Sequence, residues 1–173
     1  MKSILAIINP TAGNSSAEEM RTMLEDKLRA NFSKYEIKET KQAGDATQFA
    51  AAAIEEGVDT ILIMGGDGSV NETLQAFVEV ENTPALAIVP AGTGNILARI
   101  HGAPKDAAEA IEALDFSQEK NINICLANDQ VFAIFLSFGV ISDAIHSASS
   151  EDKDKLGFFA YVKETITGLQ NDQ

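Results

Sequence analysis

Apolar residues along this chain form short, nearly continuous runs separated by amphipathic segments. Three such runs, Ser3–Ile8, Thr60–Met64 and Ala85–Val89, are typical of strands that are buried on both faces of a parallel sheet. The stretch Tyr35–Thr40 alternates between apolar and polar positions and predicts one more strand.

Helical periodicity fills the intervals between these runs. Met20, Met23, Leu24 and Leu28 mark one face of a helix. Further helices are predicted in three places: from Gly44-Asp45 to Gly57, over Asn71–Val80 and over Asp106–Leu114. Strand, turn and helix repeat with short connections, which indicates right-handed βαβ units on a parallel sheet. The sequence therefore predicts an α/β, Rossmann-like nucleotide-binding domain.

The pattern changes near Asn121. The runs Asn121–Ala127 and Val131–Phe138 are joined by Asn128-Asp129-Gln130, which predicts an antiparallel hairpin, and Leu156–Leu169 looks helical. We therefore expect the α/β domain over residues 1–120, and over residues 121–173 an incomplete portion of a β-rich second domain. A plain antiparallel edge on a single domain is the alternative.

Each continuous apolar run ends in a glycine-rich turn. The turns read Asn9-Pro10-Thr11-Ala12-Gly13, Gly65-Gly66-Asp67-Gly68-Ser69 and Pro90-Ala91-Gly92-Thr93-Gly94-Asn95. Glycine lets the backbone approach a ligand closely, so that bare N–H groups can point at an anion. Parallel strands place their carboxyl ends at one sheet edge, where ligands bind, so the turns together predict a nucleotide phosphate site.

The second turn carries the most chemistry. A helix N-terminus stabilises phosphate without a lysine, and no turn contains the lysine of a P-loop. Asp67 would repel phosphate unless a divalent cation lies between them or the carboxylate faces a transferable proton. Glu72 could either stabilise the helix start or contact the ligand. In the other turns, we expect Asn9 to brace its loop, amides near Thr11 to line phosphates, and Asn95 to cap a helix.

These segments in combination resemble a known family. Asn9-Pro10-x-x-Gly13, Gly65-Gly66-Asp67-Gly68-Ser69-x-Asn71-Glu72 and Pro90-x-Gly92-Thr93-x-Asn95 with Ala98-Arg99 resemble the catalytic-domain family of diacylglycerol and sphingoid-base kinases, especially the soluble bacterial lipid kinases. Thr40 followed by Gly44-Asp45-Ala46 also matches a segment of that family. The sequence departs from the family pattern at Ser69, Ala12 and Ile96, where threonine, serine and an acidic residue are common.

The resemblance implies an NAD kinase/phosphofructokinase-like fold and an ATP- and magnesium-dependent lipid kinase of phospholipid biosynthesis that phosphorylates a lipid hydroxyl such as that of diacylglycerol. It implies Asp67 as a catalytic residue, with the general base expected beyond Gln173 and the metal ligands not identified. The nucleotide contacts that it implies are Asn9, Pro10, Thr11, Ala12, Gly13, Thr40, Gly66, Asp67, Gly68, Ser69, Val70, Asn71, Glu72 and Thr93. Two alternatives stay open: an NAD kinase-like nucleotide kinase and a non-catalytic nucleotide-binding module.

Composition and charge limit the partners and the cellular compartment that we expect. A net charge of −13 argues against a nucleic-acid partner and against electrostatic docking on an anionic membrane, although transient membrane contact and a homodimer stay open. The single cysteine, Cys125, lies in an apolar strand-like run, so we expect it in the core of a protein from a reducing cytoplasm. No apolar stretch is long enough for a membrane span.

Overall fold

A computed structural model describes residues 2–12 and 17–133. The chain divides into two compact units, residues 1–133 and 134–173. The helix expected over Leu156–Leu169, the end of the second hairpin strand and Gly13 of the first turn lie outside the described residues. The boundary expected between residues 120 and 121 stays a prediction.

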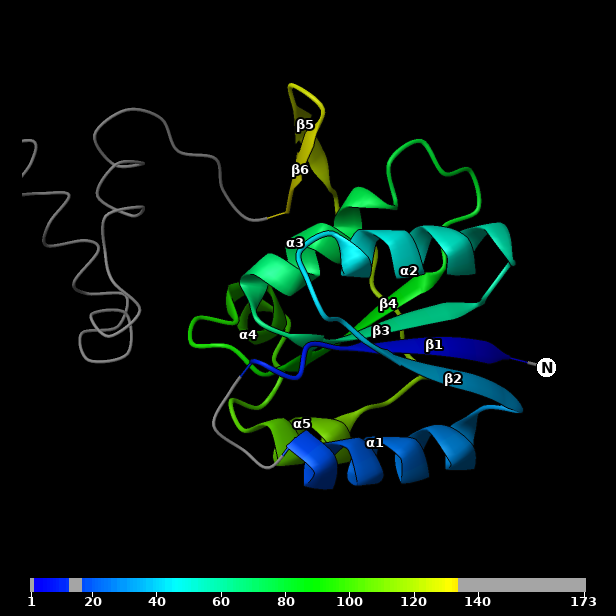
Figure 1. Ribbon diagram of the computed structural model, residues 1–173, viewed down its shortest axis with the longest axis vertical. Coiled ribbons are helices and arrows are strands. Elements are labelled where there is room, and N and C mark those ends of the chain that lie inside the picture. The colour runs from blue at the N-terminus through cyan, green and yellow to red at the C-terminus, as the bar shows by residue number, and fades with distance from the viewer. Residues whose placement is uncertain (1, 13–16, 134–173) are drawn as a thin grey trace, which may run out of the picture. The chain divides into compact units, whose positions relative to one another are not determined.

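A four-stranded parallel sheet forms the centre of the first unit, as the apolar runs predict (Figure 1). Its strands are β1 (Ser3–Ile8), β2 (Lys34–Glu39), β3 (Thr60–Gly65) and β4 (Ala85–Pro90). They lie in the order β2-β1-β3-β4. From β1 the chain first moves outward to β2 and then returns to β3 on the other side of β1. Such a reversal leaves a crevice at the carboxyl ends of β1 and β3, where ligands bind in open α/β sheets.

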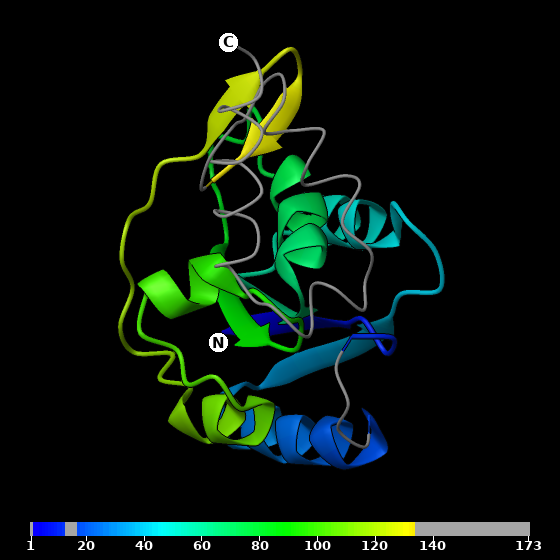
Figure 2. The same ribbon diagram turned by 90° about the vertical axis from the view of Figure 1, so that its left-hand side faces the viewer.

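Helices cover both faces of this sheet (Figures 1 and 2). One face packs against α1 (Ala17–Asn31) and α5 (Ala107–Ala113), and the other packs against α2 (Asp45–Glu55) and α3 (Asp67–Gln75). A short helix, α4 (Ile96–Ile100), follows the third glycine turn. None of the helices in the described part of the chain is long and apolar enough to span a bilayer.

Strand β1 shows how the sequence divides the core between the two faces. Ile4, Ala6 and Ile8 pack in the cluster on the α1 side, and Leu5 and Ile7 pack in the cluster on the α2 side. All of these side chains are buried, because alternate residues of a strand point to opposite faces and helices cover both. Met20, Leu24 and Leu28 of α1 are buried as their spacing predicts.

Helix α3 differs from the prediction of Asn71–Val80. It begins four residues earlier, at Asp67, and ends at Gln75. Gly66 is its N-cap in an extended conformation, with φ −88° and ψ −176°, so the second glycine turn is itself the first turn of the helix. Low helix propensity of Gly68 favours a later start, but the buried Val70 and Leu74 tie the early turn to the sheet.

The predicted antiparallel hairpin is present, and its first strand is shorter than expected. Strands β5 (Cys125–Ala127) and β6 (Gln130–Phe132) flank a tight turn in which Asn128 and Asp129 have positive φ. Val131 is buried in the core cluster on the α2 and α3 side of the sheet, whereas Leu126 is 53% exposed. The expectation that Cys125 is a core residue is wrong, because Cys125 and its neighbour Leu126 in β5 are both exposed.

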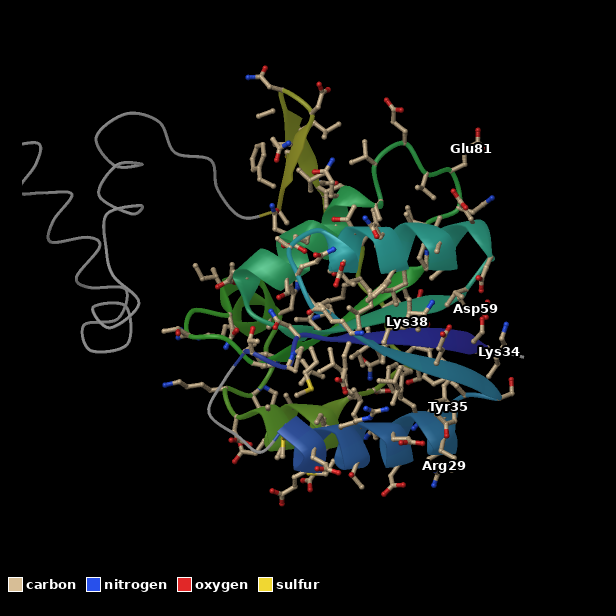
Figure 3. The ribbon with its side chains drawn as sticks, viewed as in Figure 1. Arg29, Lys34, Tyr35, Lys38, Asp59 and Glu81 are labelled. Carbon is tan, nitrogen blue, oxygen red and sulfur yellow. The ribbon has the colours of Figure 1, made fainter. Side chains whose placement is uncertain are left out.

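Polar contacts fix the opposite, amino-terminal edge of the sheet, where Figure 3 shows Lys34 and Asp59. Asp59 Oδ2 accepts hydrogen bonds from the backbone N and from Oγ of Ser3, at 2.7 and 2.8 Å. These bonds hold the pKa of the Asp59 carboxyl below its ordinary value. The starts of β1 and β3 are thereby locked together, which sets the register of their carboxyl ends.

Candidate functional site

The first turn of α3 leaves its amides open at the carboxyl end of β3. The first intrahelical bond runs from Val70 N to Gly66 O at 3.1 Å. Among the described residues, the amides of Asp67, Gly68 and Ser69 have no acceptor. A Cβ atom added to the exposed Gly68 would meet nothing within 4 Å. Such amides carry the partial positive charge of the helix N-terminus, so this surface can bind an anion.

The second and third turns are in direct backbone contact. A Cβ atom added to Gly92 would lie only 2.6 Å from the Cα of Gly66. Only two glycines permit this approach. A ligand therefore cannot lie between Gly66 and Gly92.

Asn95 braces the third turn from within. Its Oδ1 accepts from Gly92 N at 2.9 Å, and its Nδ2 donates to Gly92 O at 2.5 Å. The residue is 5% exposed and adopts a left-handed conformation with φ 50°. We expected its side chain to cap the following helix, but that prediction is wrong, because the side chain folds back onto Gly92.

Asp67 supplies a bond to the start of α4 instead. Its Oδ1 accepts from Ile96 N at 2.7 Å. Its Oδ2 lies beside Gly94, where an added Cβ atom would come within 2.7 Å of that oxygen. The carboxylate thus joins the second turn to the third, which explains physically why an acidic residue is stable at this position.

The first turn is closed by Asn9. Its Oδ1 accepts from the backbone N and from Oγ1 of Thr11, at 3.1 and 2.8 Å, and its backbone O accepts from Ala12 N at 3.2 Å. Its Nδ2 donates to Ser69 Oγ at 2.9 Å, which ties this turn to α3. The amides of Thr11 and Ala12 are therefore engaged rather than directed at a ligand.

Carboxylates also close the turn between β2 and α2. Thr40 N donates to Ile8 O at 2.9 Å and continues the sheet. Asp45, 8% exposed, accepts from Lys41 N at 2.7 Å and from Gln42 N at 3.1 Å. The Lys41 amide is the main reason that the pKa of Asp45 lies below its ordinary value. Glu72 Oε2 accepts from Gly44 N at 3.0 Å.

The structure thus brings most of the expected nucleotide contacts to one sheet edge. Asn71 and Thr93 are exposed there, whereas the side chain of Val70 is 5% exposed and belongs to the core. Sequence reasoning missed the bracing roles of Asn95 and Asp45. Their residue types offered a signal, because Asn and Asp side chains commonly bond nearby backbone amides.

Comparison with known proteins identifies the family. The protein-family model for the diacylglycerol kinase catalytic domain matches residues 3–127 of this chain. A protein of Streptococcus pneumoniae serotype 4 described as a putative lipid kinase is 39% identical over 173 residues, which is 100% of this chain and 59% of the relative. The diacylglycerol kinase of Bacillus subtilis is 30% identical over 162 residues, covering 93% of this chain and 54% of the relative.

A solved structure agrees with these matches. The crystal structure of a diacylglycerol kinase from Bacillus anthracis aligns with a TM-score of 0.71 and 35% identity, covering 76% of this chain and 49% of that one. The chain spans about half the length of the relatives that it matches. It belongs to the diacylglycerol kinase catalytic domain family.

Proposed function

We propose that this chain is the nucleotide-binding part of an ATP-dependent lipid kinase, which transfers the γ-phosphate of ATP to a lipid hydroxyl such as that of diacylglycerol. The observation that carries the proposal is the set of unengaged amides at the N-terminus of α3, beside the β1–β3 crevice, in a member of this family. The family match favours a lipid acceptor over the NAD kinase-like alternative. The reaction would belong to phospholipid biosynthesis in the cytoplasm.

The polyphosphate of ATP would lie on the amides of Asp67, Gly68 and Ser69. These amides can exchange water for phosphate oxygens without breaking any bond within the protein. Around them, the exposed or half-buried residues Thr40, Asn71 and Thr93 would contact the rest of the nucleotide. The first turn would form a wall of the site through Pro10 and Thr11, both exposed, rather than through its amides.

Magnesium fits this arrangement through Asp67. Mg²⁺ in kinases is usually held by one or two carboxylates together with substrate phosphates and water. No group of three or more acidic, histidine or cysteine residues in residues 2–12 and 17–133 could hold an ion alone, so the phosphates would complete its coordination. Asp67 Oδ2 is the oxygen available for this role, because Oδ1 holds Ile96 N. When bound, the ion would neutralise charge on the transferred phosphoryl group.

The remaining parts of the reaction are proposed to lie elsewhere. A kinase must also orient the acceptor hydroxyl and accept its proton. We assign the general base and the lipid site to the part of the relatives that this chain does not cover, since those relatives are nearly twice as long. Transient contact with a membrane surface would then deliver the lipid.

Calorimetric titration with ADP and ATP, with and without magnesium, tests the nucleotide site on this chain. We expect binding at millimolar concentration or below, and no binding at that concentration would contradict the proposal. Phosphate transfer by the product of the complete reading frame tests the acceptor. We expect transfer to diacylglycerol and not to NAD, whereas nucleotide binding without any transfer would identify a non-catalytic module.

A further inference from the structure

Glu72 makes two hydrogen bonds to the start of α2. Its Oε2 accepts from Gly44 N at 3.0 Å, and its backbone O accepts from Thr47 Oγ1 at 2.7 Å. Within the described residues, these are the hydrogen bonds that join α3 to α2 and its N-cap. A single residue thus fixes one helix to the other at two points.

The two elements that Glu72 joins lie on opposite sides of the crevice. The turn after β2 lies on one side of β1, and α3 follows β3 on the other side. The turn is attached to β1 at Thr40 and to α3 at Gly44, through Glu72. The side chain of Glu72 therefore links the two sides of the crevice at the β1–β3 reversal.

The turn after β2 is held to α3 through the amide of Gly44. Gly44 is the N-cap of α2 in a left-handed conformation with φ 89°, and it provides no side chain to bond the first amides of the helix. Asp45 engages the amides of Lys41 and Gln42, and Glu72 engages that of Gly44. Because carboxylates accept from these three amides, none of the three is open to phosphate, and we assign the turn to the nucleoside part of a nucleotide.

We infer that Glu72 is a positioning residue that fixes the turn carrying Thr40 against α3, and so sets the fit of the nucleoside part of ATP. This inference rests on the proposed nucleotide site and changes the expected role of one of its residues. Instead of touching the ligand, Glu72 would act through the Gly44 amide. Binding of the nucleoside part would then depend on Glu72, whereas binding of polyphosphate on the α3 amides would not.

Binding constants for ADP and for inorganic tripolyphosphate test the inference, with Glu72→Ala, Glu72→Gln and the exposed Glu55→Ala of α2 as a matched control. Loss of a hydrogen bond to a charged group predicts that Glu72→Ala weakens ADP binding about tenfold. Tripolyphosphate affinity should stay unchanged. Glu72→Gln keeps an acceptor oxygen and should restore most of the ADP affinity, and Glu55→Ala should resemble the wild type. Equal losses for both ligands, or no rescue by glutamine, would overturn the inference.

A double-mutant cycle separates positioning from direct contact. If Glu72 acts through the turn, Thr40→Ala combined with Glu72→Ala should bind ADP no more weakly than the weaker single variant. Effects that multiply would instead indicate that each residue touches the nucleotide independently.

Amide hydrogen exchange at Gly44 provides a readout without any nucleotide. This amide should be protected in the wild type and in Glu55→Ala, and it should exchange rapidly in Glu72→Ala. Rapid exchange in the wild type would overturn the inference even if nucleotide binds. Absence of binding by the wild type, with Gly44 protected, would instead contradict the proposed nucleotide site.

Discussion

The turn after β3 and the turns after β1 and β4 lie at the same sheet edge, but they differ in what their amides bond. After β3, the extended Gly66 leads straight into a helix, and the next three amides have no acceptor in the part of the chain that the structure describes. After β1 and β4, an asparagine side chain folds back onto the turn, Asn9 onto Thr11 and Asn95 onto Gly92. The asparagine side chain thus occupies one backbone amide in each of these two turns, that of Thr11 and that of Gly92.

Glycine content alone therefore does not define a phosphate site. All three turns combine glycine with small polar residues, and their glycine content does not distinguish them. The deciding property is whether an amide already has an acceptor, because a bonded amide must lose that bond before it can bind phosphate. By this criterion the second turn is the one that we propose as the anion site, with the other two turns as its supports.

The largest effect is expected for Gly92→Ala, which would force the second and third turns apart. The new Cβ atom would lie 2.6 Å from Gly66 Cα and 3.0 Å from Asn95 Oδ1. Because backbone atoms cannot move aside cheaply, we expect the free energy of unfolding to fall by about 3 kcal/mol. Urea denaturation measures this change, and a variant as stable as the wild type would show that the two turns are not in contact.

Asn95→Ala tests whether the third turn depends on the hydrogen bonds between the Asn95 side chain and the backbone of Gly92. It removes two hydrogen bonds to Gly92 and places alanine in a left-handed conformation, so we expect a loss of about 2 kcal/mol in unfolding free energy. Asn95→Gly separates the two causes, because glycine tolerates this conformation but makes no side-chain bond. If glycine restored full stability, the hydrogen bonds would contribute nothing.

Gly68→Ala is expected to separate stability from binding in the second turn. An added methyl group would meet no protein atom within 4 Å, and alanine favours a helix over glycine, so stability should rise by about 0.5–1 kcal/mol. The same methyl group would cover the open amides, and ADP affinity should fall about tenfold, as for the loss of one charge-assisted hydrogen bond. Unchanged affinity in calorimetry would place the phosphates elsewhere.

The sequence predicts most of the fold, because buried parallel strands have a distinctive pattern. The bounds of β1 agree with its apolar run, and β3 and β4 each extend one residue beyond theirs. The start of α3 could not be predicted, since Asp67-Gly68-Ser69 has low helix propensity and becomes helical through packing of Val70 and Leu74. Cys125 was misplaced because an apolar run does not reveal which side of a hairpin faces the core.

The candidate site was predicted by location but not by the state of its amides. Turn composition placed the three turns at one edge, which the parallel sheet ensures. Whether Asn9 would bond its own turn or a ligand depends on side-chain conformation, which is not encoded in a short motif. The partner of Glu72, Gly44, is 28 residues away in the sequence and becomes visible only in three dimensions.

The smallest effect concerns pH and compares the two edges of the sheet. Amide hydrogen bonds lower the pKa of Asp45 at the carboxyl edge and of Asp59 at the amino edge below the ordinary value of 3.8. A group whose pKa is lower in the folded state stabilises the fold above its unfolded pKa, and this contribution is lost as the pH falls through the folded pKa. Asp45→Asn and Asp59→Asn should therefore each be less stable than the wild type at neutral pH, and the differences should shrink below about pH 3.8.

Ligand binding distinguishes the two carboxylates at neutral pH. Asp45 holds the amides of the turn that carries Thr40, so Asp45→Asn should weaken ADP binding as well as stability. The carboxylate of Asp59 bonds Ser3 at the start of β1, at the other edge of the sheet, so Asp59→Asn should change stability alone. Denaturation from neutral to acidic pH, together with ADP titration at neutral pH, measures both properties. Equal weakening of ADP binding by the two variants would mean that the edges are not independent. ADP affinity would then follow the global stability of the fold and not the local structure of the turns.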